Sequence, residues 1–189
     1  MTPKREKPKR MPNPKTKHIV LGVCGSIAAY KAGDIIRRLQ DKHCEVTVIM
    51  TREAAEFITS LTLATLSGRD VHSEMFDKGS WRMAHIELAR SADAVLIAPA
   101  TANLIGKLAN GLADDLLTTF VMSSSAPVFI APAMNDQMYA NAIVRDNCAK
   151  LKKFGFKFIE PLKGQLACGV VGIGHLAEVD DIIKAVLNN

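Results

Sequence analysis

The sequence predicts an α/β fold in which a doubly wound parallel sheet lies between two layers of helices. Two observations predict it: apolar runs typical of strands alternate along the chain with segments of helical periodicity, and these runs carry no polar alternation. Continuous apolar strands are expected where helices cover both faces of a sheet. Because 189 residues are enough for one substantial core and few for two, we expect a single domain.

Six strands are expected in order along the chain. They span residues 18–25, 45–51, 70–76, 92–100, 126–133 and 156–161, and the third is the weakest. Helices are expected at 26–43, 54–66, 84–91, 103–124, 136–154 and 179–188. In the first helix Ala32, Ile35, Ile36 and Leu39 share one face, and Gly68 ends the second helix.

A glycine-rich stretch, LACGVVGIG at 166–174, follows the last expected strand. Gly164, Gly169, Gly172 and Gly174 fall within eleven positions and disfavour helix and strand alike. We therefore expect a mobile loop here that carries Cys168. A free cysteine is most often a small buried apolar residue, so a chemical role for Cys168 needs further support.

Residues 1–17 are a basic, proline-rich tail. They hold seven Lys and Arg residues against Glu6 and contribute +6 to the net charge of +5, which leaves −1 for residues 18–189. We expect the tail to be disordered and 18–189 to form the folded domain. Because this domain is nearly neutral, no nucleic-acid partner is expected. The apolar runs stop far short of the ~20 residues that cross a bilayer, so we expect no membrane partner and a cytoplasmic location.

The four cysteines do not form a metal-binding pattern. No C-x-x-C pair occurs, and no histidine stands at zinc-ligand spacing from any of them, so no metal site is expected. Cys24 and Cys44 lie in or beside expected strands and should be buried in the core. Cys148 lies in an expected helix, which leaves Cys168 as the cysteine among glycines.

The carboxyl ends of the strands are where ligands bind in such sheets. Gly25 and Ser26 follow the first strand, where free backbone N–H groups and a hydroxyl suit a phosphate, although an ordinary serine cap is an equally good interpretation. Because the junction lacks G-x-G-x-x-G, a mononucleotide fits better than a dinucleotide. Thr51 follows the second strand and suits either a phosphate or ribityl chain or a helix cap.

Two proline turns follow later strands. In APATAN, at 98–103, Thr101 and Asn103 surround exposed backbone amides on which a flat ring can rest. In APAMN, at 131–135, Asn135 offers hydrogen-bond donors and an acceptor at the rim, although such an asparagine is most often a helix cap. His85, at the start of the expected helix 84–91, is a candidate general base, but one histidine among five carries little weight by itself.

Four motifs in order resemble one family. GSIAAYK, AHIELARSADAVLIAPATANLIGKLANGLADDLLTT, PAMNDQMY and GQLACGVVGIG are similar to the motifs of the flavin-dependent cysteine decarboxylases, and the resemblance spans about residues 18–188. It is closest to the branch that decarboxylates phosphopantothenoylcysteine in coenzyme A synthesis. The resemblance implies a Rossmann-like or flavodoxin-like three-layer flavoprotein.

The resemblance implies FMN as cofactor and assigns roles residue by residue. The cofactor residues would be Gly25, Ser26 and Ile27 at the phosphate, Thr51 beside them, and Pro99, Ala100, Thr101 and Asn103 along the flavin. His85 would be catalytic, and Cys168 would be the proton donor on a lid. Asn135 would bind the carboxylate of the substrate's cysteine, with Met138 and Ala167 nearby.

The implied reaction is oxidation of the substrate thiol to a thioaldehyde, loss of CO₂, and protonation and re-reduction of the resulting enethiolate to 4'-phosphopantetheine. Relatives assemble as trimers, or as dodecamers built from trimers, so a homo-oligomer is expected. Two positions depart from the family: Tyr139 stands where tryptophan is common, and His175 where arginine often follows the glycines. The chain ends at Asn189 without the ligase domain that many bacterial relatives carry, so we expect a monofunctional enzyme or a piece of a longer one.

Three alternatives compete with this interpretation. A peptidyl-cysteine decarboxylase would share the flavin site, and GQLACG favours the small-molecule branch without deciding it. A flavin prenyltransferase would share the architecture but should not need PAMN or the cysteine lid. A non-catalytic regulator that binds partners would be expected to lose the histidine or cysteine, whereas His85, Asn135 and Cys168 are all present.

Overall fold

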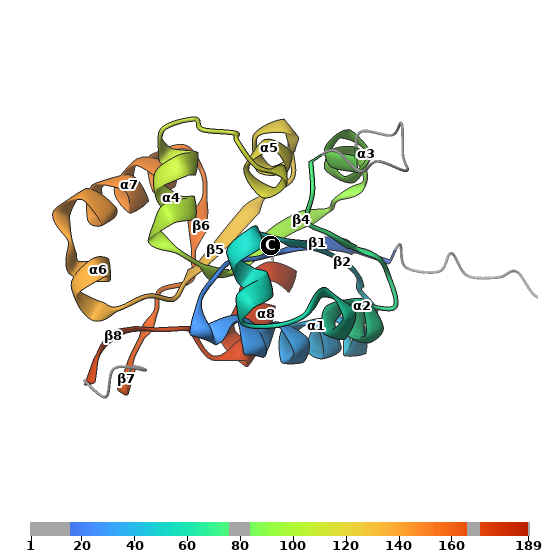
Figure 1. The fold of residues 1–189 in the computed structure, drawn as a ribbon, viewed down its shortest axis with the longest axis horizontal. Helices are drawn as coiled ribbons and strands as arrows, with labels where there is room; N and C mark the ends of the chain where they lie inside the picture. Colours follow the sequence, from blue (N-terminus) through green and yellow to red (C-terminus); the bar gives the residue numbers. More distant parts are fainter. Residues whose placement is uncertain (1–15, 76–83, 166–170, 189) are drawn as a thin grey trace, which may run out of the picture.

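A six-stranded parallel sheet runs through the middle of the molecule (Figure 1), as the computed structural model of residues 16–75, 84–165 and 171–188 shows. Its strands are β1 (His18–Val23), β2 (Glu45–Met50), β3 (Val71–His72), β4 (Ala94–Ala100), β5 (Val128–Pro132) and β6 (Lys157–Phe158). They lie in the order β3-β2-β1-β4-β5-β6, and every neighbouring pair is parallel. The predicted doubly wound sheet is confirmed, and the chain reverses direction across the sheet between β1 and β4.

Helices cover both faces of this sheet (Figure 1). One layer contains α1 (Ala32–Asp41), α2 (Ser60–Ser67) and α8 (Val179–Leu187). The other contains α3 (Ala84–Ser91), α4 (Ala102–Ala109), α5 (Leu116–Ser123) and α7 (Ala142–Lys153). Three shorter helices, η1 (Ile27–Lys31), η2 (Arg52–Glu56) and α6 (Asp136–Ala140), follow strands β1, β2 and β5.

The core has two halves because alternate residues of each central strand face opposite layers. In β1, Ile19 and Leu21 pack with the layer of α1 and α8, whereas Val20 packs with that of α4 and α5. All three side chains are fully buried. Burial on both faces is why the strands are continuously apolar. The prediction that Cys24 and Cys44 would be buried is confirmed, and Cys148, which lies in α7 as expected, is buried as well.

Four expected helices are interrupted, and the prediction of continuous helices there was wrong. Polar side chains cap a new helix inside three of the expected segments: Thr59 accepts from the Thr62 N–H, Asp115 from the Thr118 N–H and Asn141 from the Ile143 N–H. The segment 103–124 is therefore two helices, α4 and α5, and Gly111 between them has a positive φ of 70°. The first segment, 26–43, starts with η1, which Ser26 caps, before α1 begins.

The glycine-rich stretch is not all loop, which corrects a second prediction. Strands β7 (Leu162–Gln165) and β8 (Val171–His175) pair antiparallel outside the six-stranded sheet. The backbone hydrogen bonds between β7 and β8 stabilise the extended conformation, which glycine by itself does not favour. The predicted mobility of the lid falls on residues 166–170, which lie outside the described residues, as do 1–15 of the predicted tail.

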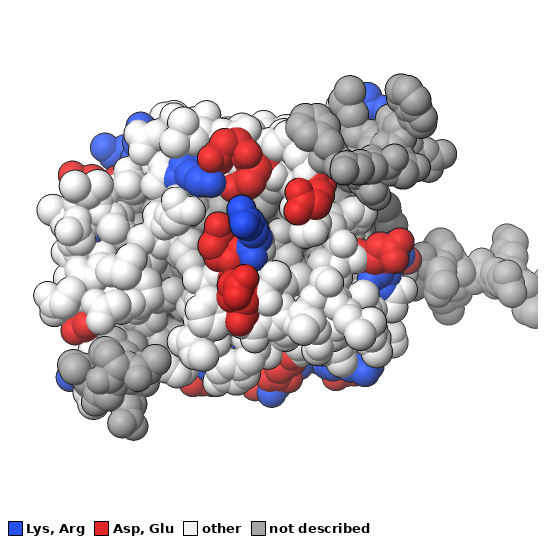
Figure 2. All heavy atoms as spheres, viewed as in Figure 1, with Lys and Arg blue, Asp and Glu red and all other residues white. Residues whose placement is uncertain are grey.

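On the face seen in Figure 2, the Lys and Arg side chains of the described residues stand next to Asp and Glu and do not gather into a broad basic patch. Within the described parts of the chain, no helix is both long and apolar enough to cross a membrane.

Candidate functional site

A cavity of about 270 Å³ lies at the carboxyl ends of the central strands. Its lining comes from the segments that follow four strands: Gly25 and Ser26 after β1, Thr51 and Glu53 after β2, Thr101 to Leu104 after β4, and Ala133, Met134 and Met138 after β5. Asp115 at the start of α5 completes it. The cavity therefore lies at the switch point where ligands of this fold class bind.

Gly25 allows the ends of β1 and β2 to approach closely. A Cβ atom at Gly25 would lie 2.5 Å from the Cβ of Glu53 and 3.0 Å from the Glu53 backbone. Any other residue would push the two junctions apart. Ser26 lines the cavity, and its Oγ accepts a hydrogen bond of 3.4 Å from the Ala28 N–H, so the capping interpretation describes this side chain.

Thr51 differs from the other hydroxyl residues at the strand ends. It occupies the N-cap position of η2 but makes no side-chain capping bond. Its Oγ1 is buried, and no partner among the described residues reaches it. A buried hydroxyl without a partner costs on the order of 1–3 kcal/mol. Because Thr51 lines the cavity, a ligand that hydrogen-bonds to Oγ1 would remove this cost.

Thr101, Pro99 and Ala100 contribute mainly to the local structure of β4 and α4. Thr101 Oγ1 accepts a hydrogen bond from the Leu104 N–H at 3.4 Å and caps α4. Pro99 and Ala100, predicted in a turn along the flavin, are instead buried residues of β4, and the Ala98–Pro99 peptide bond is cis. Of the predicted cofactor residues, Asn103 does line the cavity, whereas Ile27 lies in η1 and is 59% exposed.

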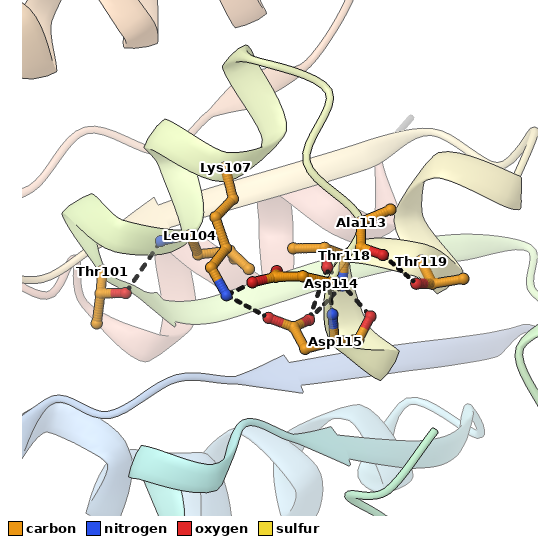
Figure 3. A network of polar contacts seen from close by, with 8 residues as sticks. All are labelled: Thr101, Leu104, Lys107, Ala113, Asp114, Asp115, Thr118 and Thr119. Carbon is orange, nitrogen blue, oxygen red and sulfur yellow. Dashed lines mark hydrogen bonds and ion pairs between the residues drawn. The ribbon is translucent and has the colours of Figure 1, made fainter. Parts of the chain in front are cut away.

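A charged network borders the cavity at the start of α5 (Figure 3). Lys107 Nζ on α4 lies 2.9 Å from Asp115 Oδ2 and 2.8 Å from Asp114 Oδ1. These hydrogen bonds raise the pKa of Lys107 to about 12. Burial by itself would raise the pKa of Asp115, but the Thr118 N–H and Lys107 outweigh it and lower that pKa. Both groups are therefore charged at neutral pH.

The thiol of Cys24 interacts with three residues that line the cavity, Thr101, Asp115 and Glu53. Complete burial, with smaller contributions from Asp115 and Glu53, outweighs the hydrogen bonds with Thr101 and raises its pKa to about 12. The thiol stays protonated at neutral pH and is a core residue, not a nucleophile.

Strand β8 lies directly against the segment that contains Asn135. The Met134 N–H donates to the Gly174 carbonyl at 3.1 Å. A Cβ atom at Gly174 would overlap with the Met134 carbonyl oxygen, and one at Gly172 would lie 2.6 Å from the Cβ of Asp136. These two glycines are needed because only a backbone without side chains can approach so closely.

Asn135 is exposed and caps α6; it is not among the residues that line the cavity, although Met134 and Met138 of the same segment are. Its Oδ1 accepts from the N–H groups of Gln137 at 2.9 Å and Met138 at 3.4 Å. The predicted cap is therefore present. Met138 lines the cavity, so the structure brings this predicted substrate residue to the same edge as Thr51 and Asn103.

Tyr139, the last residue of the PAMNDQMY motif, is part of a second polar cluster. Its hydroxyl donates to Glu160 Oε2 at 2.5 Å, and Lys152 Nζ lies 2.5 Å from Glu160 Oε1. The Arg145 guanidinium lies over the tyrosine ring, 5.3 Å from its centroid. Burial and then Glu160 raise the pKa of Tyr139, so the phenol is neutral.

Three predicted residues cannot be placed at the cavity. His85 lies in α3, which packs against α5, but its side chain is outside the described part of the structure. Ala167 and Cys168 lie outside the described residues altogether. Their roles stay predictions.

Residues 7–189 match the protein-family model described as Flavoprotein. The chain belongs to the flavoprotein family. A flavin is therefore the cofactor class of this flavoprotein, and the cavity fits one: Gly25 allows the two strand ends that border the cavity to approach closely, and Thr51 offers a buried hydroxyl for a ribityl or phosphate oxygen.

Relatives of this flavoprotein have names from coenzyme A metabolism. It is 46% identical over 174 residues to the coenzyme A biosynthesis bifunctional protein CoaBC of Borreliella burgdorferi, covering 92% of this chain and 45% of that protein. It is also 46% identical over 174 residues to a probable phosphopantothenoylcysteine decarboxylase of Streptococcus mutans, covering 90% of this chain and 97% of that protein. The flavoprotein thus spans less than half the length of the CoaBC relatives it matches.

A solved structure of similar fold is a PPC decarboxylase variant in complex with pantothenoylaminoethenethiol. It superposes with a TM-score of 0.81 at 32% identity, covering 90% of this flavoprotein and 96% of that chain.

Six residues that line the cavity were not predicted from the sequence: Glu53, Ala102, Leu104, Asp115, Ala133 and Met134. Asp115 has a recognisable signature, because aspartate is one of the preferred N-cap residues of helices. It was hidden inside a segment whose apolar periodicity suggested one long helix.

Proposed function

We propose that this flavoprotein uses FMN to decarboxylate 4'-phosphopantothenoylcysteine to 4'-phosphopantetheine. The observation that carries the proposal is the meeting of two features at one edge of the sheet: a cavity with the buried Thr51 hydroxyl, and the 133–138 segment with Asn135, held by β8. The near-complete match to the Streptococcus mutans relative supports the substrate.

FMN is proposed rather than a dinucleotide for two reasons. The β1–η1 junction has one glycine before Ser26 and lacks the dinucleotide fingerprint. The cavity is also small, near the lower end of the ~300–1,000 Å³ range of ligand pockets, which favours a mononucleotide.

The chemistry needs an electron acceptor, because direct loss of CO₂ from a cysteine carboxylate leaves a carbanion with no place for its electron pair. When bound, the flavin supplies two-electron chemistry, accepting two electrons from the substrate thiol and returning them after CO₂ has left. The substrate carbon chain then passes from thiol to thioaldehyde, loses CO₂ to become an enethiolate, and regains two electrons and protons as the product thiol. No outside oxidant or reductant is consumed.

The residues of this chain bind and orient the groups. The Thr51 hydroxyl donates to an oxygen of the ribityl or phosphate group, which satisfies its buried oxygen atom. A substrate carboxylate accepts hydrogen bonds, so Asn135 would meet it through the N–H groups of its amide, while its Oδ1 caps α6. The cap fixes the plane of the amide and so orients those donors.

His85 and Cys168 are proposed to move protons. His85 would accept the thiol proton during oxidation, because imidazole exchanges protons near neutral pH. Cys168 would donate a proton to the enethiolate carbon from the segment between β7 and β8. The hairpin would close that segment over the substrate and exclude water.

A homotrimer, or a dodecamer built from trimers, is proposed as the working assembly. Exposed apolar side chains follow β1 and β2 at the edge that holds the cavity, namely Ile27, Tyr30, Phe57 and Leu61. Burial of such side chains against a second copy is favourable. Light scattering that finds a monomer at working concentration would contradict this assembly.

The substrate proposal is tested by supplying phosphopantothenoylcysteine and, separately, a peptide that ends in cysteine, and measuring CO₂ and thiol product. We expect turnover with the small molecule. Activity only on the peptide would move the function to the peptidyl branch, and activity on neither by protein loaded with FMN would contradict catalysis.

The role of Asn135 is tested with a matched pair of variants. Asn135 and Asn141 both cap a helix through Oδ1, and aspartate keeps that acceptor. Asn135→Asp places a negative charge against the substrate carboxylate and should lower kcat/KM about 100-fold or more. Asn141→Asp should change it less than about twofold. Equal effects of the two substitutions would remove Asn135 from the substrate site.

A further inference from the structure

Asp115, the N-cap residue of α5, lines the cavity, as does the acidic residue Glu53. Its Oδ1 accepts hydrogen bonds from the Thr118 N–H and the Thr118 hydroxyl, each at 2.8 Å. Its Oδ2 accepts from Lys107 Nζ at 2.9 Å (Figure 3). These contacts fix the carboxylate from α4 and α5 together, so its orientation does not depend on a ligand.

The carboxylate has one acceptor site left at its Oδ2 atom. An ionised carboxylate offers about four lone-pair sites. Thr118 uses the two sites on Oδ1, and Lys107 uses one of the two on Oδ2. One acceptor site on Oδ2 is left for a ligand, because the Asp115 side chain lines the cavity.

The charge of this group determines which ligand atom it can meet. Thr118 and Lys107 keep Asp115 ionised at neutral pH, and a carboxylate repels a phosphate at close range but accepts from N–H and O–H donors. A flavin carries both kinds of donor, in the imide N–H of its ring and in the hydroxyls of its ribityl chain.

We infer that Asp115 is a cofactor-binding residue whose Oδ2 accepts a hydrogen bond from an N–H or O–H donor of the bound flavin, and that Lys107 positions this carboxylate. The inference rests on the flavin site proposed above and adds a residue that lies within the quoted GLADDLLTT stretch but was given no role from the sequence.

A direct test compares Asp115→Asn with Asp114→Asn in flavin-free protein titrated with FMN. Both aspartates pair with Lys107, but only Asp115 lines the cavity, so Asp114 is the matched control. Loss of a hydrogen bond to a charged acceptor should raise the Kd for FMN at least about tenfold in D115N. D114N should stay within about twofold of the wild type, because Asp114 is well exposed.

Asparagine is also a good N-cap residue, so D115N should keep the start of α5. If D115N nevertheless fails to fold, Lys107→Gln and Lys107→Arg replace it: glutamine should weaken FMN binding and arginine should restore it.

The midpoint reduction potential of the bound flavin gives a readout that a purely structural role would not move. A negative charge beside the flavin disfavours the electron-rich reduced form, so D115N should shift the potential in the positive direction and D114N should not.

Two analogues identify the donor. With N3-methyl-FMN the difference in Kd between wild type and D115N should vanish if the ring N–H is the donor, and with lumiflavin it should vanish if a ribityl hydroxyl is. A difference that persists with both analogues overturns the inference, as does an unchanged Kd and potential in D115N. Failure of the wild type to bind FMN would instead overturn the proposed function.

Discussion

Large apolar side chains hold the six-stranded sheet in place, whereas glycines that allow close contact hold the β7–β8 hairpin in place. In β1 every residue from Ile19 to Val23 is buried, and large apolar side chains fill the space between sheet and helices. In β8 the residues alternate, with Val171 and Ile173 exposed and Gly172 and Gly174 buried. The hairpin is held where side chains are missing, because its glycines contact the backbone and side chain of Met134 and Asp136.

This difference separates stability from function. The close packing of buried apolar side chains between the sheet and its helices is the main contribution to the free energy of unfolding of the domain. The hairpin contributes little core, and its glycines set how closely β8 lies against the segment that contains Asn135. We therefore expect sheet variants to lose stability and hairpin variants to lose activity.

The largest effect is expected in the core, away from the cavity. Leu39 on α1 is fully buried, and Leu39→Ala should lower the free energy of unfolding by about 2–5 kcal/mol. Urea unfolding measures this as a lower midpoint at unchanged slope. The kcat/KM of the folded, FMN-loaded variant should stay close to that of the wild type, and a large loss there would contradict the separation.

The second effect is expected at the hairpin. In Gly174→Ala the added Cβ overlaps with the Met134 carbonyl oxygen, and overpacking of this kind costs about 1–3 kcal/mol. If that cost falls on docking of β8, kcat/KM for decarboxylation should fall about 10-fold to 100-fold while FMN binding is unchanged.

Gly164→Ala is the control in the same hairpin, because its Cβ would make an ordinary contact of 3.5 Å with His175. Equal losses in the two glycine variants would show that the close approach at Gly174 does not matter.

A smaller effect is expected at Thr51, with opposite signs for stability and binding. Thr51→Val removes the buried hydroxyl without changing side-chain shape, so the flavin-free protein should be as stable as the wild type or up to ~1 kcal/mol more stable. FMN should bind about 3-fold to 10-fold more weakly.

Thr101→Val removes a hydroxyl that caps α4 and should instead lower stability by about 1 kcal/mol. Thermal unfolding and FMN titration of both variants measure the contrast. A Thr51→Val variant that is less stable without flavin and binds FMN normally would contradict the assigned role.

The smallest effect is expected at Glu160, near the edge of the sheet where the chain enters the hairpin. Burial tends to raise the pKa of this carboxyl, but hydrogen bonds from Lys152 and Tyr139 lower it below its ordinary value of 4.5. A carboxylate of this kind stabilises the fold above its unfolded pKa and loses that effect as pH falls through its folded pKa. Because the pair is half exposed, its contribution should stay below about 1 kcal/mol.

The measurement is the difference in Tm between wild type and Glu160→Gln as a function of pH. The difference should be constant from neutral pH down to about pH 5 and shrink below about pH 4.5. A difference that grows in acid would contradict the direction of the shift.

The sheet could be predicted from the sequence because its strands are continuously apolar, a local property. The break between α4 and α5 could not, because apolar periodicity on both sides concealed the Asp115 cap. Strand β8 was missed because Gly174 is stabilised by a partner far along the chain, Met134.

At the site, residue type and position along the chain were insufficient to predict which hydroxyl caps a helix and which is available to a ligand. Ser26, Thr51 and Thr101 all follow strands. From the sequence, capping and ligand binding were alternatives for Ser26 and Thr51, whereas Thr101 was predicted only to lie along the ligand. Capping requires a backbone N–H within reach, which Ser26 and Thr101 have and the Thr51 hydroxyl lacks among the described residues. Asp115 lies at the cavity because α4 packs on α5, and no local sequence pattern encodes this tertiary contact.

The most direct measurement is the rate of CO₂ release from phosphopantothenoylcysteine before and after the flavin is removed, and again after FMN is added back. We predict that release stops in the flavin-free protein and returns in proportion to the fraction of sites filled with FMN. Undiminished release from fully stripped protein would contradict the account.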